Sequence, residues 1–263
     1  MKIRKNAVSG SFYPNNIKEL HTYFEHFNAL SQNKELKIKH PKAIISPHAG
    51  YVYSGLTANE VYRCIANEHI KRIIVIGPSH RVFIEGASIA LYDEFETPLG
   101  NLKMDLDYSH ELKEHFDTLF FNPLAHAEHS TETQMPFIKN YFPHTSVVEI
   151  VYGKIDYLEL CKIISYIMLE SENLVVISTD LSHFYSQEDA NYLDGIFLQA
   201  IQNLDLEKLD SGCEACGMIG VKAIAQYAIK NHLKSQIIDY RTSYDASGDD
   251  SRVVGYTSVL IGK

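Results

Sequence analysis

The chain has 263 residues, 45% of them hydrophobic, which is enough to bury a large core, and we expect a single domain over residues 1–263. Lys and Arg total 24 against 33 for Asp and Glu, and the resulting net charge of -9 offers no footprint for nucleic acid or an anionic membrane. Four cysteines are too few for a disulfide scaffold, and no apolar run reaches the length of a membrane span, so we expect a soluble, cytoplasmic protein.

Helices and strands alternate in the apolar pattern of the first half of the chain. A helix is expected over residues 16–30, where apolar side chains recur at helical spacing. Apolar, β-branched runs predict buried strands over 42–47 and 72–77, with a helix over 55–67 between them and a further strand over 86–92. This alternation predicts an α/β fold whose central, mostly parallel or mixed sheet is flanked by helices.

The middle of the chain carries a turn signal and a cap signal. A Pro-Leu-Gly turn within residues 95–107 indicates a hairpin that is placed to cover a site. Thr131 stands three residues before Gln134, which is the capping-box pattern of a helix start. Glu128 and His129 are then expected just before that N-terminus.

The second half of the chain continues the alternation. Strands are expected over 146–151, 173–177, 237–244 and 253–261, and helices over 108–119, 157–169, 187–203 and 217–231. An acidic turn over 245–251 joins the last two strands. We find no internal repeat or linker that divides the chain.

Two of the predicted strands end on histidines. His48 directly follows the strand predicted over 42–47, and His80 stands three residues after the strand predicted over 72–77. Ligands in open α/β sheets bind beyond the carboxyl ends of the strands, where imidazoles can act as metal ligands or bases. We interpret His48 and His80 as a metal-binding or catalytic pair, against the alternative that they are core or turn histidines.

The strand over 173–177 is followed by Asp180 and His183. Because they are three residues apart, the carboxylate can orient the imidazole as a general base; the alternative is that Asp180 only caps the turn. The acidic turn adds Asp245, Asp249 and Asp250. Two histidines and a carboxylate form the ligand set of non-haem Fe(II) sites, and with a water they also suit zinc hydrolysis.

Further polar and aromatic residues are expected around the same pocket. Glu128 and His129 either bind substrate there or are a helix cap and its neighbour, because a helix N-terminus attracts negative charge. Tyr51, Tyr53 and Tyr244 are expected to line the pocket.

Cys213 and Cys216 form a C-x-x-C motif without a second pair for zinc and without a thioredoxin-like context. We therefore interpret both cysteines as packing residues at the start of the next helix.

Several motifs of this chain occur, in the same order, in a known family. The sequence resembles the Memo family, known in prokaryotes as protein B of the AmmeMemoRadiSam system, nearly from end to end. The motifs are AVSGSFYP, SPHAGYVYSG, GPSH, TPLGNLKMD, EHSTETQMPF, STDLSH and TSYDASGDDSRVVGY.

The resemblance implies a fold like that of LigB-type class III extradiol dioxygenases. It also implies that His48 and His80 are metal ligands and that His183, with Asp180 beside it, is the acid/base residue. Animal Memo proteins have a cysteine as third ligand where this chain has Ala246. Asp245 is the nearest replacement and Asp249 the next, and a two-histidine site with waters, or a pocket without metal, stays open.

The resemblance leads to two functional hypotheses. The first is an oxidoreductase of unnamed substrate that uses Fe(II) or copper. The second is a non-catalytic module that binds a small molecule or peptide and works with radical SAM and AMMECR-type proteins. A zinc hydrolase is less favoured, because no nucleophile elbow or H-E-x-x-H motif accompanies the histidines.

Overall fold

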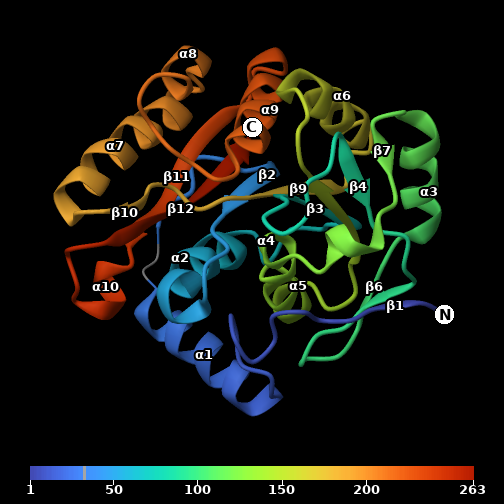
Figure 1. The fold of residues 1–263 in the computed structure, drawn as a ribbon, viewed down its shortest axis with the longest axis horizontal. Helices are drawn as coiled ribbons and strands as arrows, with labels where there is room; N and C mark the ends of the chain where they lie inside the picture. Colours follow the sequence, from blue (N-terminus) through green and yellow to red (C-terminus); the bar gives the residue numbers. More distant parts are fainter. Residues whose placement is uncertain (32–33) are drawn as a thin grey trace.

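A mixed β-sheet runs through the centre of the computed structural model, which describes residues 1–31 and 34–263 (Figure 1). Within these residues the sheet has nine strands in the order β10-β12-β2-β9-β3-β8-β4-β7, with β11 paired to β12. The strands are β2 (Pro41–Ser46), β3 (Arg72–Pro78), β4 (Ala87–Ile89), β7 (Leu119–Phe120), β8 (Ser146–Tyr152), β9 (Asn173–Ser178), β10 (His183–Tyr185), β11 (Lys234–Thr242) and β12 (Val253–Gly262).

The four central strands β2, β9, β3 and β8 are parallel to one another. Their runs of Ile and Val are buried on both faces, as parallel strands covered by helices require. Because they are parallel and adjacent, their carboxyl ends meet at one edge of the sheet. The register confirms this, since Ser46 at the end of β2 lies opposite Ser178 at the end of β9.

Helices cover both faces of the sheet. One face packs against α6 (Tyr157–Ile167), α7 (Gln187–Asn203) and α9 (Met218–Lys230), and the other against α1 (Ile17–Leu30), α2 (Tyr51–Cys64) and α5 (Met135–Tyr141). Figure 1 shows α6 and α9 side by side and α1 next to α2. The remaining helices are α3 (Leu106–His115), α4 (His129–Glu132), α8 (Leu206–Leu209), α10 (Tyr244–Ser247) and the 3-10 helix η1 (Pro123–His126). The predicted α/β fold with a mixed sheet flanked by helices is confirmed.

A small second sheet holds the N-terminal segment. Its strands are β1 (Ile3–Arg4), β5 (Glu94–Phe95) and β6 (Leu102–Lys103). The antiparallel pair β5 and β6 is the predicted hairpin, which is confirmed, and β1 pairs with β5. Here the hairpin pairs with the N-terminus of the chain. The guanidinium of Arg4 lies 4.4 Å from the centre of the Phe95 ring.

Several local predictions differ from the structure. The helix expected over 108–119 ends at His115, and Leu119 belongs to strand β7. The helix expected over 55–67 begins at Tyr51, so the segment after His48 turns directly into a helix. The capping box at Thr131 and Gln134 does not form, because the Thr131 hydroxyl donates to Glu149 and the Gln134 amide to the carbonyl of Pro47. Both side chains make contacts with distant parts of the chain in place of a local cap.

Among the described residues, no helix is both long enough and apolar enough to cross a membrane.

Candidate metal centre

Three histidines meet at the carboxyl edge of the central strands. His48 follows β2, His80 follows β3, and His129 opens α4. One ligand atom from each lies within 4.8 Å of the others. The ring centres are 5.2 Å apart for His48 and His80, 5.3 Å for His48 and His129, and 4.5 Å for His80 and His129. We call these three residues the histidine cluster.

Hydrogen bonds fix the orientation of His48. Its backbone N–H donates to Oδ1 of Asp180 at 2.7 Å, and its Nδ1 lies 2.9 Å from Oγ of Ser178. The Ser178 hydroxyl donates to the carbonyl of Ser130 at 2.5 Å and accepts from the amide of Gln134 at 3.0 Å. Since its one hydrogen is already committed, Ser178 accepts from His48, which places the ring hydrogen on Nδ1 and leaves the lone pair on Nε2.

One carboxylate orients the other two imidazoles. Oε1 of Glu128 lies 3.2 Å from Nδ1 of His80 and 2.8 Å from Nδ1 of His129, while Oε2 accepts the backbone N–H of His80 at 2.7 Å. An ionised carboxylate only accepts, so both rings carry their hydrogen on Nδ1. Metal-binding histidines are held in this way in proteins, with the second nitrogen donating to a carboxylate or a neutral oxygen.

The charge state of the cluster follows from burial and neighbours. Burial lowers the pKa of His48 to about 4, helped by His80 and His129 and opposed by the attraction of Asp180. Burial alone would raise the pKa of the Glu128 carboxyl, but its hydrogen bonds with His129 and His80 hold it well below the usual range. At neutral pH the cluster therefore contains a neutral His48 beside an ionised Glu128.

Gly77, near the end of β3 and three residues before His80, allows α4 to pack closely against this strand. A Cβ at this position would lie 2.7 Å from Oγ of Ser130, so a larger residue would push α4 away. The Ser130 hydroxyl donates to the carbonyl of Pro78 at 2.7 Å. This contact places His129 beside His80.

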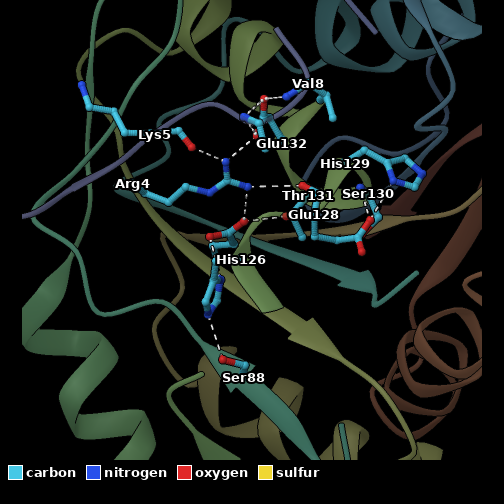
Figure 2. A network of polar contacts seen from close by, with 12 residues as sticks. Arg4, Lys5, Val8, Ser88, His126, Glu128, His129, Ser130, Thr131 and Glu132 are labelled. Atoms are coloured by element: carbon cyan, nitrogen blue, oxygen red, sulfur yellow. Dashed lines mark hydrogen bonds and ion pairs between the residues drawn. The ribbon is translucent and has the colours of Figure 1, made fainter. Parts of the chain in front are cut away.

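Besides its contact with β3, the helix α4 is held by a buried ionic network (Figure 2). Arg4 pairs with Glu132, and its Nη2 lies 3.4 Å from Oε1 of Glu149 in β8. Glu149 also accepts from the Thr131 hydroxyl at 2.6 Å and from Nδ1 of His126 at 2.9 Å. Burial alone would raise the pKa of Glu149, but Arg4 and His126 lower it below its usual value. Glu149 is therefore ionised at neutral pH although it is fully buried.

The same network ties the N-terminal segment to the cluster. Glu132 accepts the backbone N–H groups of Ala7 and Val8, each at 2.8 Å, and Arg4 donates to the backbone carbonyl of Glu128 at 3.3 Å (Figure 2). Further along this segment the Phe12 ring lies 4.8 Å from the ring of His129. Residues near the N-terminus thus position the carboxylate and imidazole of α4.

Cys216 lies directly against the histidine cluster. Its Sγ is 3.2 Å from Nε2 of His48 and accepts the backbone N–H of Asp180 at 3.2 Å. Burial raises the pKa of this thiol to about 12, with Asp180 adding to the effect. The prediction that Cys216 only packs at a helix start was incomplete, because the side chain is part of the site.

His183 lines a cavity of about 470 Å³, whose wall also includes Cys216, Leu181 and Glu214. Its Nδ1 donates to the carbonyl of Leu181 at 2.7 Å, so Nε2 is available as a proton acceptor. Asp180 uses Oδ1 to hold the backbone of His48, and no hydrogen bond between Asp180 and His183 is present among the described residues. The carboxylate therefore orients a different histidine from the one expected.

The remaining predicted site residues lie away from the cluster. The Tyr51 ring is buried in the core, and its hydroxyl donates to the carbonyl of Thr133 at 2.8 Å. Tyr244 is 43% exposed at the start of α10. Asp245 accepts the backbone N–H of Thr242 at 2.8 Å and lines a separate cavity of about 350 Å³ together with Ala246.

The residues that sequence reasoning missed are Ser178, Gln134 and the role of Cys216. No local pattern marks them, because each acts on a group more than 40 residues away in the chain, as in the contact of Cys216 with His48 across 168 residues. Glu128 and His129 were expected either to bind substrate or to be a helix cap and its neighbour. Glu128 does cap α4, since its side chain accepts the backbone N–H of Ser130 at 3.1 Å, and the place of His129 in the cluster follows from the packing of α4 on β3.

The donors present fit a first-row transition metal. Imidazole nitrogens suit zinc, copper, iron and nickel, and the three rings offer one ligand atom each within a single small volume. Nδ1 of each ring is engaged by Ser178 or Glu128, so Nε2 is the nitrogen that can bind a metal, although Nε2 of His48 also lies 3.2 Å from Sγ of Cys216. Glu128 contributes a negative charge behind His80 and His129.

Curated relatives cover the chain almost completely. It is 31% identical over 273 residues to a MEMO1 family protein of Aquifex aeolicus, a match that covers 99% of each chain. It is 33% identical over 279 residues to a MEMO1 family protein of Methanobrevibacter smithii, covering 97% of this chain and 98% of that one.

A solved structure shares the fold at low sequence identity. The uncharacterized protein JW3007 from Escherichia coli K12 superposes with a TM-score of 0.55 at 10% identity, over 85% of this chain and 100% of that one. The family model described as "Memo-like protein" matches residues 4–260. With this match and relatives above 30% identity over almost their whole length, the chain belongs to the Memo family.

Proposed function

We propose that this protein binds a transition metal ion through His48, His80 and His129 and uses it in an oxidoreductase reaction. The observation that carries the proposal is the common orientation of the three imidazoles. Each ring has its Nδ1 hydrogen engaged by Ser178 or Glu128, so Nε2 is the nitrogen that each ring has left to bind a metal. A set of histidines that served only packing would not need this shared tautomer.

Fe(II) or copper is the ion we favour, since three imidazoles leave further coordination positions for other ligands. Such an ion supplies one-electron and dioxygen chemistry when it is bound. The protein's own residues have separate tasks. Glu128 orients two of the ligands, Asp180 holds the backbone of the third, and the cavity beside Cys216 and His183 is the place we assign to substrate.

His183 is the residue we assign to proton transfer. Its Nδ1 hydrogen bond to Leu181 fixes the tautomer, so Nε2 can accept a proton from a substrate hydroxyl and return it later. The residue is partly exposed in the cavity wall, which gives a bound molecule access to it.

Metal binding tests the first half of the proposal. The protein is expressed in medium supplied with iron and copper, and the metal content of the wild type is compared with that of His129→Ala. His110→Ala, which alters an exposed histidine of α3, is the matched control. We expect about one ion per chain in the wild type and control and a large loss in His129→Ala. Equal and negligible metal in all three would contradict the proposal.

Nitric oxide tests the second half, because it reports an open coordination position on bound Fe(II). Anaerobic Fe(II)-loaded protein is exposed to nitric oxide and measured by electron paramagnetic resonance. An iron–nitrosyl signal is the expected result. Iron that is bound but gives no such signal would favour the alternative of a non-catalytic protein that works through partners such as radical SAM or AMMECR-type proteins.

A further inference from the structure

The cavity of about 350 Å³ that Asp245 lines is separate from the histidine cluster. Its walls come from α1, α2, the end of β11 and α10, which lie next to one another (Figure 1). Most of the wall is apolar or aromatic and is formed by Tyr23, Phe27, Leu30, Val52, Tyr53 and Leu56. A concave site of this size, with apolar walls and a few polar groups, is typical of small-molecule binding.

Close packing of α1 on α2 fixes the aromatic part of the wall. A Cβ on Gly55 would lie 2.5 Å from the Phe27 ring, so a larger residue would displace that ring. The rings of Tyr23 and Phe27 meet edge to face, with their centres 5.7 Å apart. Around them Leu30, Val52 and Tyr53 are 51%, 60% and 45% exposed. Apolar side chains gathered and exposed around one cavity mark a surface that a ligand covers.

Arg241 supplies a positive charge to this cavity. Its Nε donates to Oδ2 of Asp239 at 2.9 Å, and Asp239 also accepts from the Thr57 hydroxyl at 3.0 Å and from Nζ of Lys34 at 3.2 Å. These contacts hold the guanidinium in place, and no hydrogen bond from its Nη atoms is present among the described residues. The N–H groups of a guanidinium match the two oxygens of a carboxylate.

Asp245 supplies a negative charge to the same cavity. Its Oδ2 accepts the backbone N–H of Thr242 at 2.8 Å, whereas Oδ1 has no hydrogen-bond partner in the part of the chain that the structure describes. Arg241 pairs with Asp239, and no ion pair joins it to Asp245 within residues 1–31 and 34–263. The cavity therefore offers one cation and one anion that do not neutralise each other directly.

We propose that this cavity binds a free α-amino acid with a large apolar or aromatic side chain. The carboxylate of the ligand pairs with Arg241, its ammonium group pairs with Asp245, and its side chain packs against the rings of α1 and the apolar residues of α2. A ligand with only a negative charge would face Asp245, and one with only a positive charge would face Arg241. An internal residue of a peptide carries neither charge.

Isothermal titration calorimetry of the metal-free, full-length protein with L-phenylalanine tests the proposal. Two analogues each lack one charge, since N-acetyl-L-phenylalanine has no ammonium group and phenethylamine has no carboxylate. We expect one molecule of L-phenylalanine to bind per chain and each analogue to bind at least about tenfold more weakly, because each loses a charge-assisted contact. L-alanine, which has both charges but little apolar surface, is also expected to bind more weakly.

Two variants assign each charge of the ligand to its residue. Arg241→Met should weaken L-phenylalanine binding at least about tenfold without weakening that of phenethylamine. Asp245→Asn should weaken L-phenylalanine binding without weakening that of N-acetyl-L-phenylalanine. Arg252→Met and Asp250→Asn change exposed charges outside this cavity and should bind as wild type does. Circular dichroism checks that each variant is folded.

Three outcomes would overturn the proposal. The first is no saturable binding of L-phenylalanine by wild type, and the second is equal binding of L-phenylalanine and both analogues. The third is binding that survives Arg241→Met but is lost in His129→Ala, which would place the amino acid at the histidine cluster. The first two outcomes leave the proposed metal site untouched, because neither Arg241 nor Asp245 belongs to the histidine cluster.

Discussion

Glu128→Gln is the substitution that tests the role of the carboxylate behind the histidine cluster. The side chain keeps its size and can still accept through one oxygen. Its new amide N–H₂ group, however, takes the place of the oxygen that accepts the backbone N–H of His80 at 2.7 Å. Two donors then face each other, and the imidazoles of His80 and His129 lose a charged acceptor.

The size of the effect follows from these contacts. Hydrogen bonds to a charged group contribute about 1.5–3 kcal/mol each, against about 0.5–1.5 kcal/mol for neutral pairs. Loss of an outer partner of metal-binding histidines weakens metal affinity by about 10- to 100-fold. At a free metal concentration of 100 times the wild-type Kd, the ion stabilises the wild type by about 2.7 kcal/mol. A 100-fold weaker variant would gain only about 0.4 kcal/mol.

Competition with a chromophoric chelator measures the affinity for Zn(II) or Co(II), and urea unfolding with and without metal measures the stabilisation. Glu68→Gln, which neutralises an exposed carboxylate, is the control and is expected to behave as wild type. A folded Glu128→Gln protein that binds metal as tightly as wild type would show that the carboxylate does not orient the ligands.

Three further predictions concern stability. Arg4→Met leaves Glu132 and Glu149 buried without their cation and should lower the free energy of unfolding by about 3–5 kcal/mol. Lys5→Met, which removes an exposed ion pair, should change that free energy by less than about 1 kcal/mol. Equal losses of stability for the two variants in urea titrations would contradict this prediction. The pKa of Glu149 is lower in the folded chain than its ordinary value of 4.5, so its contribution is complete above about pH 4.5 and is lost as the pH falls further. Urea titrations from pH 7 downward should show this decline, and Glu149→Gln should flatten it; an identical decline in that variant would count against the assignment. Tyr51→Phe removes a buried hydrogen bond and should lower the free energy of unfolding by about 1–3 kcal/mol while metal affinity stays unchanged. A changed metal affinity would indicate that Tyr51 contributes to the site after all.

The sheet could be predicted well because its signal is local. The continuous β-branched runs of β2, β3 and β9 can only be buried, and the polar residues that follow them had to lie at one edge once the strands were parallel. His48 and His80 accordingly lie at the strand ends, as predicted. The helix α7 was predicted with its observed bounds for the same reason, since its apolar face repeats within the segment itself.

The rest of the site depends on contacts between distant segments. The Thr131 hydroxyl donates to the buried carboxylate of Glu149 instead of forming the predicted capping box. Glu149 lies in another strand, so this partner cannot be predicted from the residues around Thr131. Asp180 was paired with the nearest histidine in sequence, but in the fold its carboxylate accepts from the backbone of His48, 132 residues away. Cys216 was interpreted from its own motif, whereas its position is decided by how the turn before α9 packs on β9.

The proposed site holds one ion that three imidazoles share. Anomalous diffraction from a crystal of the metal-loaded protein tests this directly. We predict a single strong peak at about 2.0–2.2 Å from Nε2 of His48, His80 and His129. A peak that contacts only two of these nitrogens, or one that lies at Asp245, would contradict a site built from three histidines.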